Sequence, residues 1–389
     1  MRILHTSDWH LGRSFHRVGM LEHQAAYVDH LLEVVASEAV DLVVVAGDVY
    51  DRALPHVDAV RLADEALARL AASRARVVLT SGNHDSAQRL GFGARLFDAA
   101  GVHVRTDAST VGSPVLLEDA HGTVAVYGLP YLDPLALSEP WRLSSRTHEA
   151  ALAEAMRRVR ADLRTRDARS VVLAHAFVAG GLPSESERDI SVGGVSVVSS
   201  ELFVGISYTA LGHLHGRAVL ADALRYSGSP LAYSFSEARH TKGSWLVDLD
   251  AGGVTGTSFV EAPVPRRLSV IAGDLDFLLT DPTLASAEQS WVQATLTDPV
   301  RPERPMERLR ARFPHALVLS FAPAGDPVPS VVAEPARGRN DHQVALDFVT
   351  AMRGAPATPE ESSLLLDACD GCADDPEADV LVSAGARGG

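Results

Sequence analysis

The chain has 389 residues, of which 46% are hydrophobic, which is enough for a sizeable core and for two or three domains. Its two cysteines exclude a disulfide-stapled scaffold and favour a reducing compartment. The first residues, MRILHTSDWH, lack the basic and apolar regions of a signal peptide, and no apolar run approaches the ~18 residues of a membrane-spanning helix. We therefore expect a cytoplasmic protein that does not bind a membrane.

A formal net charge of −15 argues against a general affinity for nucleic acid, but the charge is unevenly distributed. Residues 360–389 carry eight acidic groups and one arginine. Nearly half of the excess negative charge lies in this tail, so the net charge does not exclude basic surfaces elsewhere.

Short apolar runs alternate with amphipathic stretches along the first half of the chain. The runs are rich in Val, Leu and Ile, as buried strands are, and include RILHTSD, DLVVVAGD, RVVLTSGNHD and SVVLAHAF. Helices are expected over residues 20–38, 57–73, 92–100 and 145–165. A more strand-rich section follows, with YTALGHLH, ALRYSGSP and GSWLVDLD. Strands that alternate with helices predict an α/β fold with helices on both faces of the sheet.

The rest of the chain divides into smaller parts after residues 1–262. Residues 263–325 predict a small α+β domain in which RLSVIAG, WVQATLT and ALVLSFA are strands and PMERLRARF is a helix. A Pro-rich linker is expected at 326–340, two short helices within 341–370, and an acidic, disordered tail at 371–389.

The first of these short helices, DHQVALDFVTAMR, has an apolar face that includes Phe348, Val349 and Met352. A helix of this length cannot bury such a face alone. It either folds back on its own chain or binds a partner.

Side chains that bind metals follow five of the predicted strands. They are Asp8 and His10 (SDWH), Asp48 and Asp51 (GDVYD), Asn83, His84 and Asp85 (GNHD), His175 (LAHAF), and His213 and His215 (GHLH). Each motif alone is explained as a turn or as a packed histidine. Because ligands gather at the carboxyl ends of strands in α/β sheets, the five motifs together predict one shared site.

This mixture of imidazoles, carboxylates and an amide suits two divalent transition-metal ions. Two such ions about 3.5–4 Å apart activate a water molecule and stabilise the phosphoryl oxygens during an in-line displacement. A carboxylate has to bridge them, because a shared ligand must offset their mutual repulsion. Manganese, iron and zinc all remain open.

The series D-x-H, GD-x-x-D, GNHD, H and GH-x-H resembles the calcineurin-like metallophosphoesterase pattern. More narrowly, SDWHLGR, GDVYDR, SGNHDSAQRL, GHLH and RYSGSPLAYSFSE resemble the SbcD family, the nuclease subunits of the bacterial SbcCD complexes that process double-strand breaks. The resemblance covers nearly the whole chain. It implies an α/β sandwich of two sheets flanked by helices, a DNA-binding capping domain at 263–325, and C-terminal helices that bind the SbcC ATPase.

The resemblance also implies a role for each residue of the motifs. One metal ion would bind Asp8, His10, Asp48 and His215, and the second would bind Asp48, Asn83, His175 and His213. Asp48 would be the bridging ligand, and manganese is the favoured ion. His84 would be the catalytic histidine that stabilises or protonates the leaving oxygen, with Asp85 orienting its ring.

The implied activity is manganese-dependent hydrolysis of DNA, as a double-strand exonuclease and a single-strand or hairpin endonuclease, in DNA end processing, repair, recombination and replication. The protein would act as a homodimer within a heterotetramer that includes an SbcC-type coiled-coil ATPase. Since this sequence has no P-loop, ATP-dependent control would come from that subunit. The alternatives are a phosphodiesterase or phosphomonoesterase that acts on a small molecule, and a non-catalytic scaffold, which would be expected to lose ligands.

Two weaker signals accompany the motifs. Five basic residues beside them are either contacts to DNA phosphates or ordinary surface charges: Arg13, Arg52, Arg89, Arg239 and Lys242. Cys369 and Cys372 form a single CxxC pair without the second pair that a structural zinc site needs.

Overall fold

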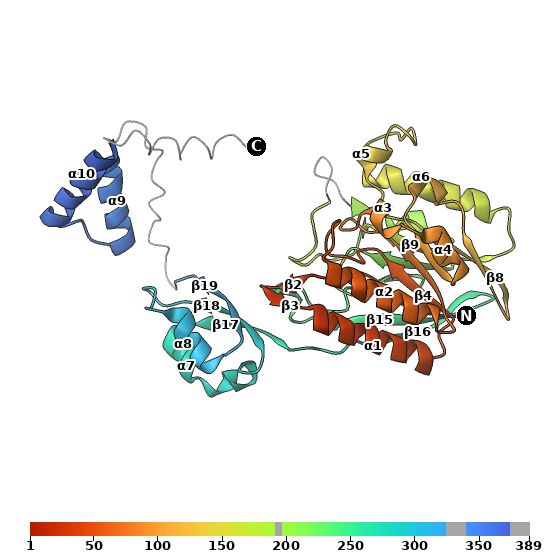
Figure 1. Ribbon diagram of the computed structural model, residues 1–389, viewed down its shortest axis with the longest axis horizontal. Helices are drawn as coiled ribbons and strands as arrows, with labels where there is room; N and C mark the ends of the chain where they lie inside the picture. Colours follow the sequence, from red (N-terminus) through yellow and green to blue (C-terminus); the bar gives the residue numbers. More distant parts are fainter. Residues whose placement is uncertain (191–196, 324–339, 374–389) are drawn as a thin grey trace. The chain divides into compact units, whose positions relative to one another are not determined.

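A computed structural model describes residues 1–190, 197–323 and 340–373 (Figure 1). Nearly all of the predicted linker and most of the predicted acidic tail lie outside the described residues. No helix within the described ranges is both long and apolar enough to cross a bilayer.

The chain forms two compact units. The first consists of Met1–Leu296 and Glu303–Ser320, and the second of Thr297–Pro302 and the residues from Phe321 onward. The sheet of the predicted capping domain thus belongs to the first unit, and a boundary at residue 262 stays a prediction.

Two six-stranded mixed sheets build most of the first unit. The first sheet has the order β16-β15-β1-β4-β5-β6, and its strands β1 (Arg2–Thr6), β4 (Leu42–Ala46), β5 (Arg76–Thr80) and β6 (Val102–Arg105) are parallel. Strand β15 (Gly243–Asp250) pairs antiparallel with β1, and β16 (Gly253–Glu261) pairs antiparallel with β15. The second has the order β13-β14-β12-β9-β8-β7, with β8 (Gly122–Gly128), β9 (Arg169–His175), β12 (Tyr208–Gly212) and β14 (Leu224–Tyr226) parallel, and β7 (Val115–Asp119) and β13 (Ala218–Ala221) antiparallel.

The sheets pack face to face, and helices cover their outer faces. Strand β4 shows why its sequence, LVVVA, is apolar throughout: Leu42 and Val44 lie in the core between the sheets, whereas Val43 and Val45 lie in the core beneath the helices. Helices α1 (Leu21–Ser37) and α2 (Val57–Ala71) cover the first sheet, and α6 (His148–Leu163) covers the second (Figure 1). This is the sandwich of two sheets flanked by helices that the family resemblance implies. The alternation of strands and helices predicted helices on both faces of a sheet, which is wrong because one face of each sheet packs on the other sheet.

The predicted helices of this region are confirmed, the short one at 92–100 as α4 (Ala94–Ala99), whereas α3 (Ala87–Leu90) was not predicted. The strands β6, β7, β8, β13 and β16 were not among the predicted elements. In β7 and β16 few residues are buried, so the apolar run that marks a central strand is missing. Short elements complete this part of the chain: α5 (Pro134–Leu137), β2 (Ser14–Phe15), β3 (Val18–Gly19), β10 (Phe177–Val178), β11 (Val197–Val198), and the 3-10 turns η1 (Ala108–Thr110), η2 (Ser200–Phe203) and η3 (Phe235–Glu237).

A three-stranded sheet follows β16, in the order β17 (Leu268–Gly273), β18 (Trp291–Leu296) and β19 (Ala316–Phe321). Helices α7 (Leu275–Thr280) and α8 (Pro305–Arg312) accompany it, with the 3-10 turn η4 (Pro282–Ala287). All the strands and the helix predicted from the sequence here are confirmed.

The two predicted C-terminal helices are present as α9 (Asp341–Arg353) and α10 (Pro359–Ala373), and they pack together as a hairpin. Asn340 caps α9 by accepting the Gln343 amide at 2.9 Å, and an Arg353–Glu361 ion pair of 2.7 Å ties the two helices together. Cys369 is a free thiol on α10.

Candidate metal centre

The sandwich brings the predicted ligands together at the carboxyl ends of five strands. Asp8 and His10 follow β1, Asp48 follows β4, Asn83 follows β5, His175 ends β9, and His213 and His215 follow β12. All are buried except Asn83, which is half-buried. Residues from both sheets therefore meet at one edge of the sandwich.

The backbone here is held in conformations that L-residues rarely adopt. Asp8, His10, Asp48 and His213 have φ angles of 53°, 46°, 49° and 102°. Such strain persists only where the surrounding structure enforces it, and it is typical of functional sites. Gly82 permits the close approach of two loops, because a Cβ at this position would lie 2.1 Å from Oδ1 of Asp48.

Asp48 occupies the central position of the cluster. Its Oδ2 lies 3.6 Å from Nε2 of His10 and 3.4 Å from Nε2 of His175. Its Oδ1 accepts the backbone amide of His84 at 2.8 Å. One carboxylate oxygen thus lies between imidazoles from two different strand ends, which is the placement of a bridging ligand.

Potential ligand atoms gather on both sides of Asp48. Three overlapping groups have ligand atoms within 4.8 Å of one another: Asp8 with His10 and His215, His10 with Asp48 and His84, and Asp8 with Asp48 and His175. Asn83 adds its Oδ1, which lies 2.9 Å from Nε2 of His175 and 3.3 Å from Nδ1 of His213. His213 lies outside those three groups and reaches the cluster through Asn83.

A hydrogen bond on the far side of the His175 imidazole fixes which of its nitrogens faces the cluster. His175 Nδ1 donates to the Ala46 carbonyl at 2.9 Å, so in the neutral ring Nε2 keeps the lone pair that a metal ion would bind. Nε2 of His10 and Nε2 of His215 face each other at 3.0 Å. Within the described residues, the buried Nδ2 of Asn83 has no hydrogen-bond partner. Imidazole lone pairs, carboxylates and an amide oxygen that converge in this way fit divalent metal ions.

The sequence profile of the calcineurin-like phosphoesterases matches residues 1–217 of the chain, which is more than half of it. The chain belongs to the calcineurin-like phosphoesterase family. It is therefore a metal-dependent phosphoester hydrolase by family, and the Asp/His cluster is its candidate dimetal site.

Three solved structures are similar to this phosphoesterase. They are TT1561 of Thermus thermophilus, with 13% identity over 66% of this chain and 98% of that one and a TM-score of 0.40; GAP50, the anchor in the inner membrane complex of Plasmodium, with 12% identity over 84% and 98% and a TM-score of 0.39; and the calcineurin-like phosphoesterase YfkN of Bacillus subtilis, with 12% identity over 67% and 90% and a TM-score of 0.33. Similarity at this level carries no information about the substrate.

Burial and mutual charge set the ionisation of the phosphoesterase cluster in the metal-free protein. Burial by itself raises the pKa of Asp48, but the charges of His175 and His10 outweigh it and the pKa lies well below its usual range. Burial likewise opposes protonation of His175, yet the Asp48 carboxylate raises the pKa of that imidazole to about 9. Burial lowers the pKa of His213 to about 3. Without metal, Asp48 and His175 therefore form a buried ion pair whose proton a cation displaces.

His84 lies beside the cluster, with its ring centroid 4.6 Å from that of His10. Its Nδ1 lies 2.8 Å from the Asp51 carbonyl. Because a carbonyl only accepts, Nδ1 carries the proton and Nε2 is the atom left for chemistry. Burial lowers the pKa of His84, and the nearby Arg188 guanidinium adds to this.

The role expected for Asp85 is wrong. Its carboxylate accepts the backbone amides of Val49, Tyr50 and Gly82 at 3.1, 2.8 and 2.9 Å. Asp85 thus holds the loops after β4 and β5 together, and the Asp51 carbonyl orients the His84 ring instead. Although Asp85 is next to His84 in the sequence, its carboxylate is directed at three backbone amides instead of at the His84 ring.

The contacts of Lys242 argue against the DNA contact that the sequence left open at this residue. The Lys242 side chain is 7% exposed, and its ammonium donates to Glu237, to Oγ of Ser229 at 2.9 Å and to the His215 carbonyl at 2.8 Å. Arg52, Arg89 and Arg239 are exposed, and Arg13 is half-buried with its guanidinium on the Ser186 carbonyl at 2.7 Å. These four stay predictions.

The sequence motifs miss several residues that the fold brings to the site. Arg188 donates to the Asn83 carbonyl at 3.2 Å, and its Nη2 lies 3.4 Å from Nδ1 of His84. Ser186 bonds to Nδ1 of His215 at 2.6 Å, and Glu187 accepts the His215 amide at 2.7 Å. All three belong to the segment SESER, which has no periodic pattern. The one feature of the sequence that could have indicated a role for this segment is its density of polar residues.

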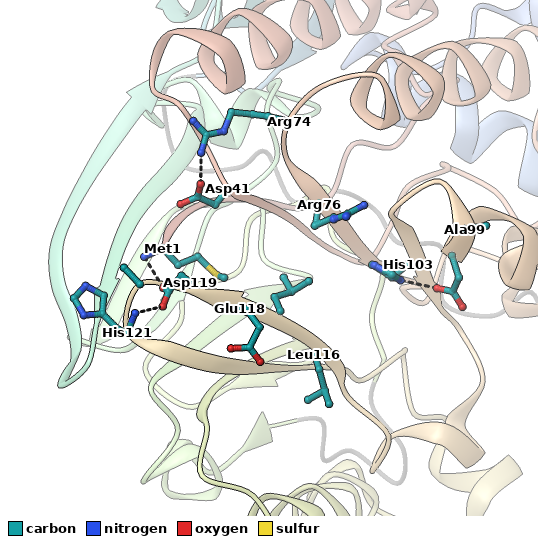
Figure 2. Close-up of a pocket in the computed structure, with 13 residues that line it drawn as sticks. Met1, Asp41, Arg74, Arg76, Ala99, His103, Leu116, Glu118, Asp119 and His121 are labelled. Carbon is teal, nitrogen blue, oxygen red and sulfur yellow. Dashed lines mark hydrogen bonds and ion pairs between the residues drawn. The ribbon is translucent and has the colours of Figure 1, made fainter.

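The large cavity in Figure 2, about 810 Å³, lies elsewhere. Arg76, which lines it, begins β5, whereas Asn83 follows the end of that strand. Its labelled polar groups are mostly paired with one another, as Arg74 is with Asp41 at 2.6 Å. The cavity is at the opposite edge of the sheet from the metal centre.

Proposed function

We propose that the chain is the nuclease subunit of an SbcCD-type complex and hydrolyses DNA phosphodiester bonds in DNA end processing, repair and recombination. One observation carries the proposal beyond the family. The two sequence elements that resemble SbcD most specifically, SDWHLGR and RYSGSPLAYSFSE, pack against each other behind the metal ligands. The Tyr233 hydroxyl donates to the Trp9 carbonyl at 2.7 Å, and the Ser7 and Ser227 hydroxyls lie 2.8 Å apart.

These contacts support the metal ligands directly. Ser7 donates to the Asp8 carboxylate, and Gln24 donates to the His10 carbonyl at 2.8 Å and to the Tyr233 hydroxyl at 3.0 Å. The family-specific residues thus hold the loop that presents the first two ligands. This supports assigning them to the same active site as the general phosphoesterase motifs.

In the proposed centre, Asp8, His10, Asp48 and His215 hold one ion, and Asp48, Asn83, His175 and His213 hold the other. The ions, with manganese favoured, would supply an activated water and Lewis-acid stabilisation of the phosphoryl oxygens. Nε2 of His84 would stabilise the leaving oxygen or transfer a proton to it. Asp51 keeps its ring in that tautomer through the carbonyl.

DNA phosphates would be bound by exposed arginines at the rim of the site. Arg188 is the best placed, because it lies beside both Asn83 and His84. We expect Arg188→Ala to raise KM for DNA and to reduce the salt dependence of binding by about one unit of slope. Arg74→Ala, which changes an exposed arginine at the opposite end of the strands from the metal centre, is the comparison.

Helices α9 and α10 are the proposed docking site for the coiled-coil ATPase. Their apolar side chains remain exposed in the described hairpin: Phe348 is 65% exposed, Met352 73% and Leu364 68%. Burying each would stabilise a complex by roughly 1.5–3 kcal/mol. Truncation after Asp326 should leave manganese-dependent cleavage intact and abolish co-purification with the ATPase.

In the full chain, Phe348→Glu with Met352→Glu should have the same effect as the truncation, and Gln343→Glu on the same helix should not. A truncated protein that binds the ATPase with full affinity would place the docking surface elsewhere.

A second group of exposed apolar side chains is the proposed surface of a homodimer. Leu54, Val57, Phe92 and Leu96 are 72%, 62%, 84% and 78% exposed. Arg89 donates to the Ala53 carbonyl at 3.0 Å, which ties the segment before α2 to the segment before α4. An apolar surface of this kind is typical of an interface between copies of a protein. Leu54→Glu with Leu96→Glu should shift a dimer to a monomer in analytical ultracentrifugation.

The substrate class is tested by comparing linear duplex DNA with bis-p-nitrophenyl phosphate, both with manganese. We expect degradation of the duplex from its ends and cleavage of hairpins. Hydrolysis of the small ester without cleavage of DNA would favour the alternative, a phosphoesterase that acts on a small molecule. We also place the protein in the cytoplasm, which fractionation of cells tests.

A further inference from the structure

A buried chain of side chains leads away from His215. Nδ1 of His215 lies 2.6 Å from Oγ of Ser186, and Oγ of Ser186 in turn bonds to Oε1 of Glu237 at 2.5 Å. Glu237 ends the turn η3 and its side chain is fully buried. The ligand, the hydroxyl and the carboxylate come from three segments that are distant in the sequence.

The direction of each hydrogen bond follows from what the groups can donate. The Glu237 carboxylate is held ionised by the Lys242 ammonium and can only accept. The single Ser186 hydroxyl proton is therefore donated to Glu237. The neighbouring Ser184 hydroxyl donates to Glu187 at 2.7 Å, so its proton is also in use. Oγ of Ser186 is left to accept from His215, and Nδ1 of His215 must carry the proton.

We propose that Ser186 and Glu237 are positioning residues that hold His215 in the Nδ1–H tautomer, with the Nε2 lone pair directed at the metal centre. The inference rests on the proposed function only in taking His215 as a metal ligand. Nε2 lies 3.0 Å from Nε2 of His10, on the side of the ring away from Ser186. Groups that orient a ligand imidazole in this way typically raise metal affinity 10–100-fold.

Two neighbouring side chains, Glu187 and Lys242, fix the backbone of His215. Its amide donates to Glu187 at 2.7 Å and its carbonyl accepts from Lys242 at 2.8 Å. His175 differs, because a backbone carbonyl, that of Ala46, fixes its tautomer. The tautomer of His215 depends on side chains alone, so a point substitution can release it.

The test uses Ser186→Ala in the full-length protein, since replacing Glu237 would leave the Lys242 ammonium buried without its counter-charge. Ser186→Thr keeps a hydroxyl and is the conservative rescue. Ser236→Ala is the structural control, because Oγ of Ser236 accepts the Glu185 amide at 3.0 Å and anchors the same segment without touching His215.

Two measurements report on the proposal without DNA. Titration of the metal-free protein with Mn²⁺, followed by electron paramagnetic resonance, gives the number and affinity of the sites. Long-range ¹H–¹⁵N spectra of ring-labelled histidine at pH 8 give the tautomer, with His215 assigned from a His215→Asn spectrum. We expect Ser186→Ala to weaken one of two Mn²⁺ sites about 10–100-fold and to shift His215 towards the Nε2–H tautomer. Ser186→Thr and Ser236→Ala should resemble wild type.

The proposal is overturned if Ser186→Ala binds both ions as wild type does, or if its His215 stays in the Nδ1–H tautomer. Equal weakening by Ser236→Ala would also overturn it, because the effect would then belong to the segment rather than to the hydroxyl. A wild-type protein that binds two ions but cleaves no DNA would contradict the proposed nuclease and leave this inference standing.

Discussion

Lys242→Met should lower the stability of the protein rather than weaken its contacts with DNA. In the folded protein the Lys242 ammonium is the counter-charge of Glu237, and the two side chains are 7% and 0% exposed. Removing the ammonium leaves an uncompensated carboxylate in the interior. Losing one partner of a buried ion pair costs about 3–5 kcal/mol, out of a total stability of about 5–15 kcal/mol for a typical domain.

The loss should depend on pH in a defined direction. Burial by itself raises the pKa of Glu237, but in the wild type Lys242 and His215 together outweigh burial, and the pKa lies well below its usual range. A lowered carboxylate pKa contributes stability above the unfolded pKa, about 4.5, and that contribution is lost as the pH falls below it. In Lys242→Met burial dominates, so the carboxyl group takes up a proton more readily and relieves the penalty. The difference between the two proteins should be largest near pH 8 and smaller near pH 5.

Guanidinium chloride unfolding of the metal-free proteins, followed by tryptophan fluorescence at both pH values, measures this difference. Chelation keeps bound metal from adding to the stability. Arg239→Met is the matched control, since its side chain is exposed and its change in unfolding free energy should be within about 0.5 kcal/mol of zero. The reasoning is refuted if Lys242→Met is as stable as wild type at pH 8 but binds DNA more weakly with a reduced salt slope.

Three further predictions concern the metal centre. Asp48→Ala should lose both ions, because Oδ2 lies between His10 and His175, whereas His10→Ala should weaken one site. Metal analysis after dialysis measures the number of bound ions. If Asp48→Ala still bound two ions, the bridging ligand would have to be another residue. His84→Ala should keep both ions, and its rate of cleavage should fall about 100-fold or more. Metal content and hydrolysis are measured on the same sample. Loss of an ion from this variant would make His84 a metal ligand. Binding of Mn²⁺ should release about one proton at pH 7.5, because the pKa of His175 is raised to about 9 in the metal-free protein and a ligand imidazole is neutral, so affinity should rise with pH up to about 9. Calorimetry in two buffers of different ionisation enthalpy counts that proton, and the same observed heat in both buffers would contradict the Asp48–His175 ion pair.

The sequence by itself predicted the layered α/β architecture and the members of the metal centre. Central strands such as LVVVA are apolar on both faces because both faces are buried, so their pattern is local and readable. The meeting of these residues was also predictable, because parallel strands place their carboxyl ends at one edge of a sheet, and Asp8, Asp48 and Asn83 each follow such a strand. Edge strands such as β7 and β16 were not predicted, since few of their residues are buried.

Only the tertiary structure decided what each polar side chain contacts. Lys242 and Asp85 both stand beside motifs in the sequence, yet one neutralises a buried carboxylate and the other ties three backbone amides. Ser186 and Glu237 lie 51 positions apart and meet only because the loop after β10 packs against the turn η3. A hydrogen-bond partner is chosen by the direction of a side chain within a packed interior, and neither spacing nor residue type encodes that direction.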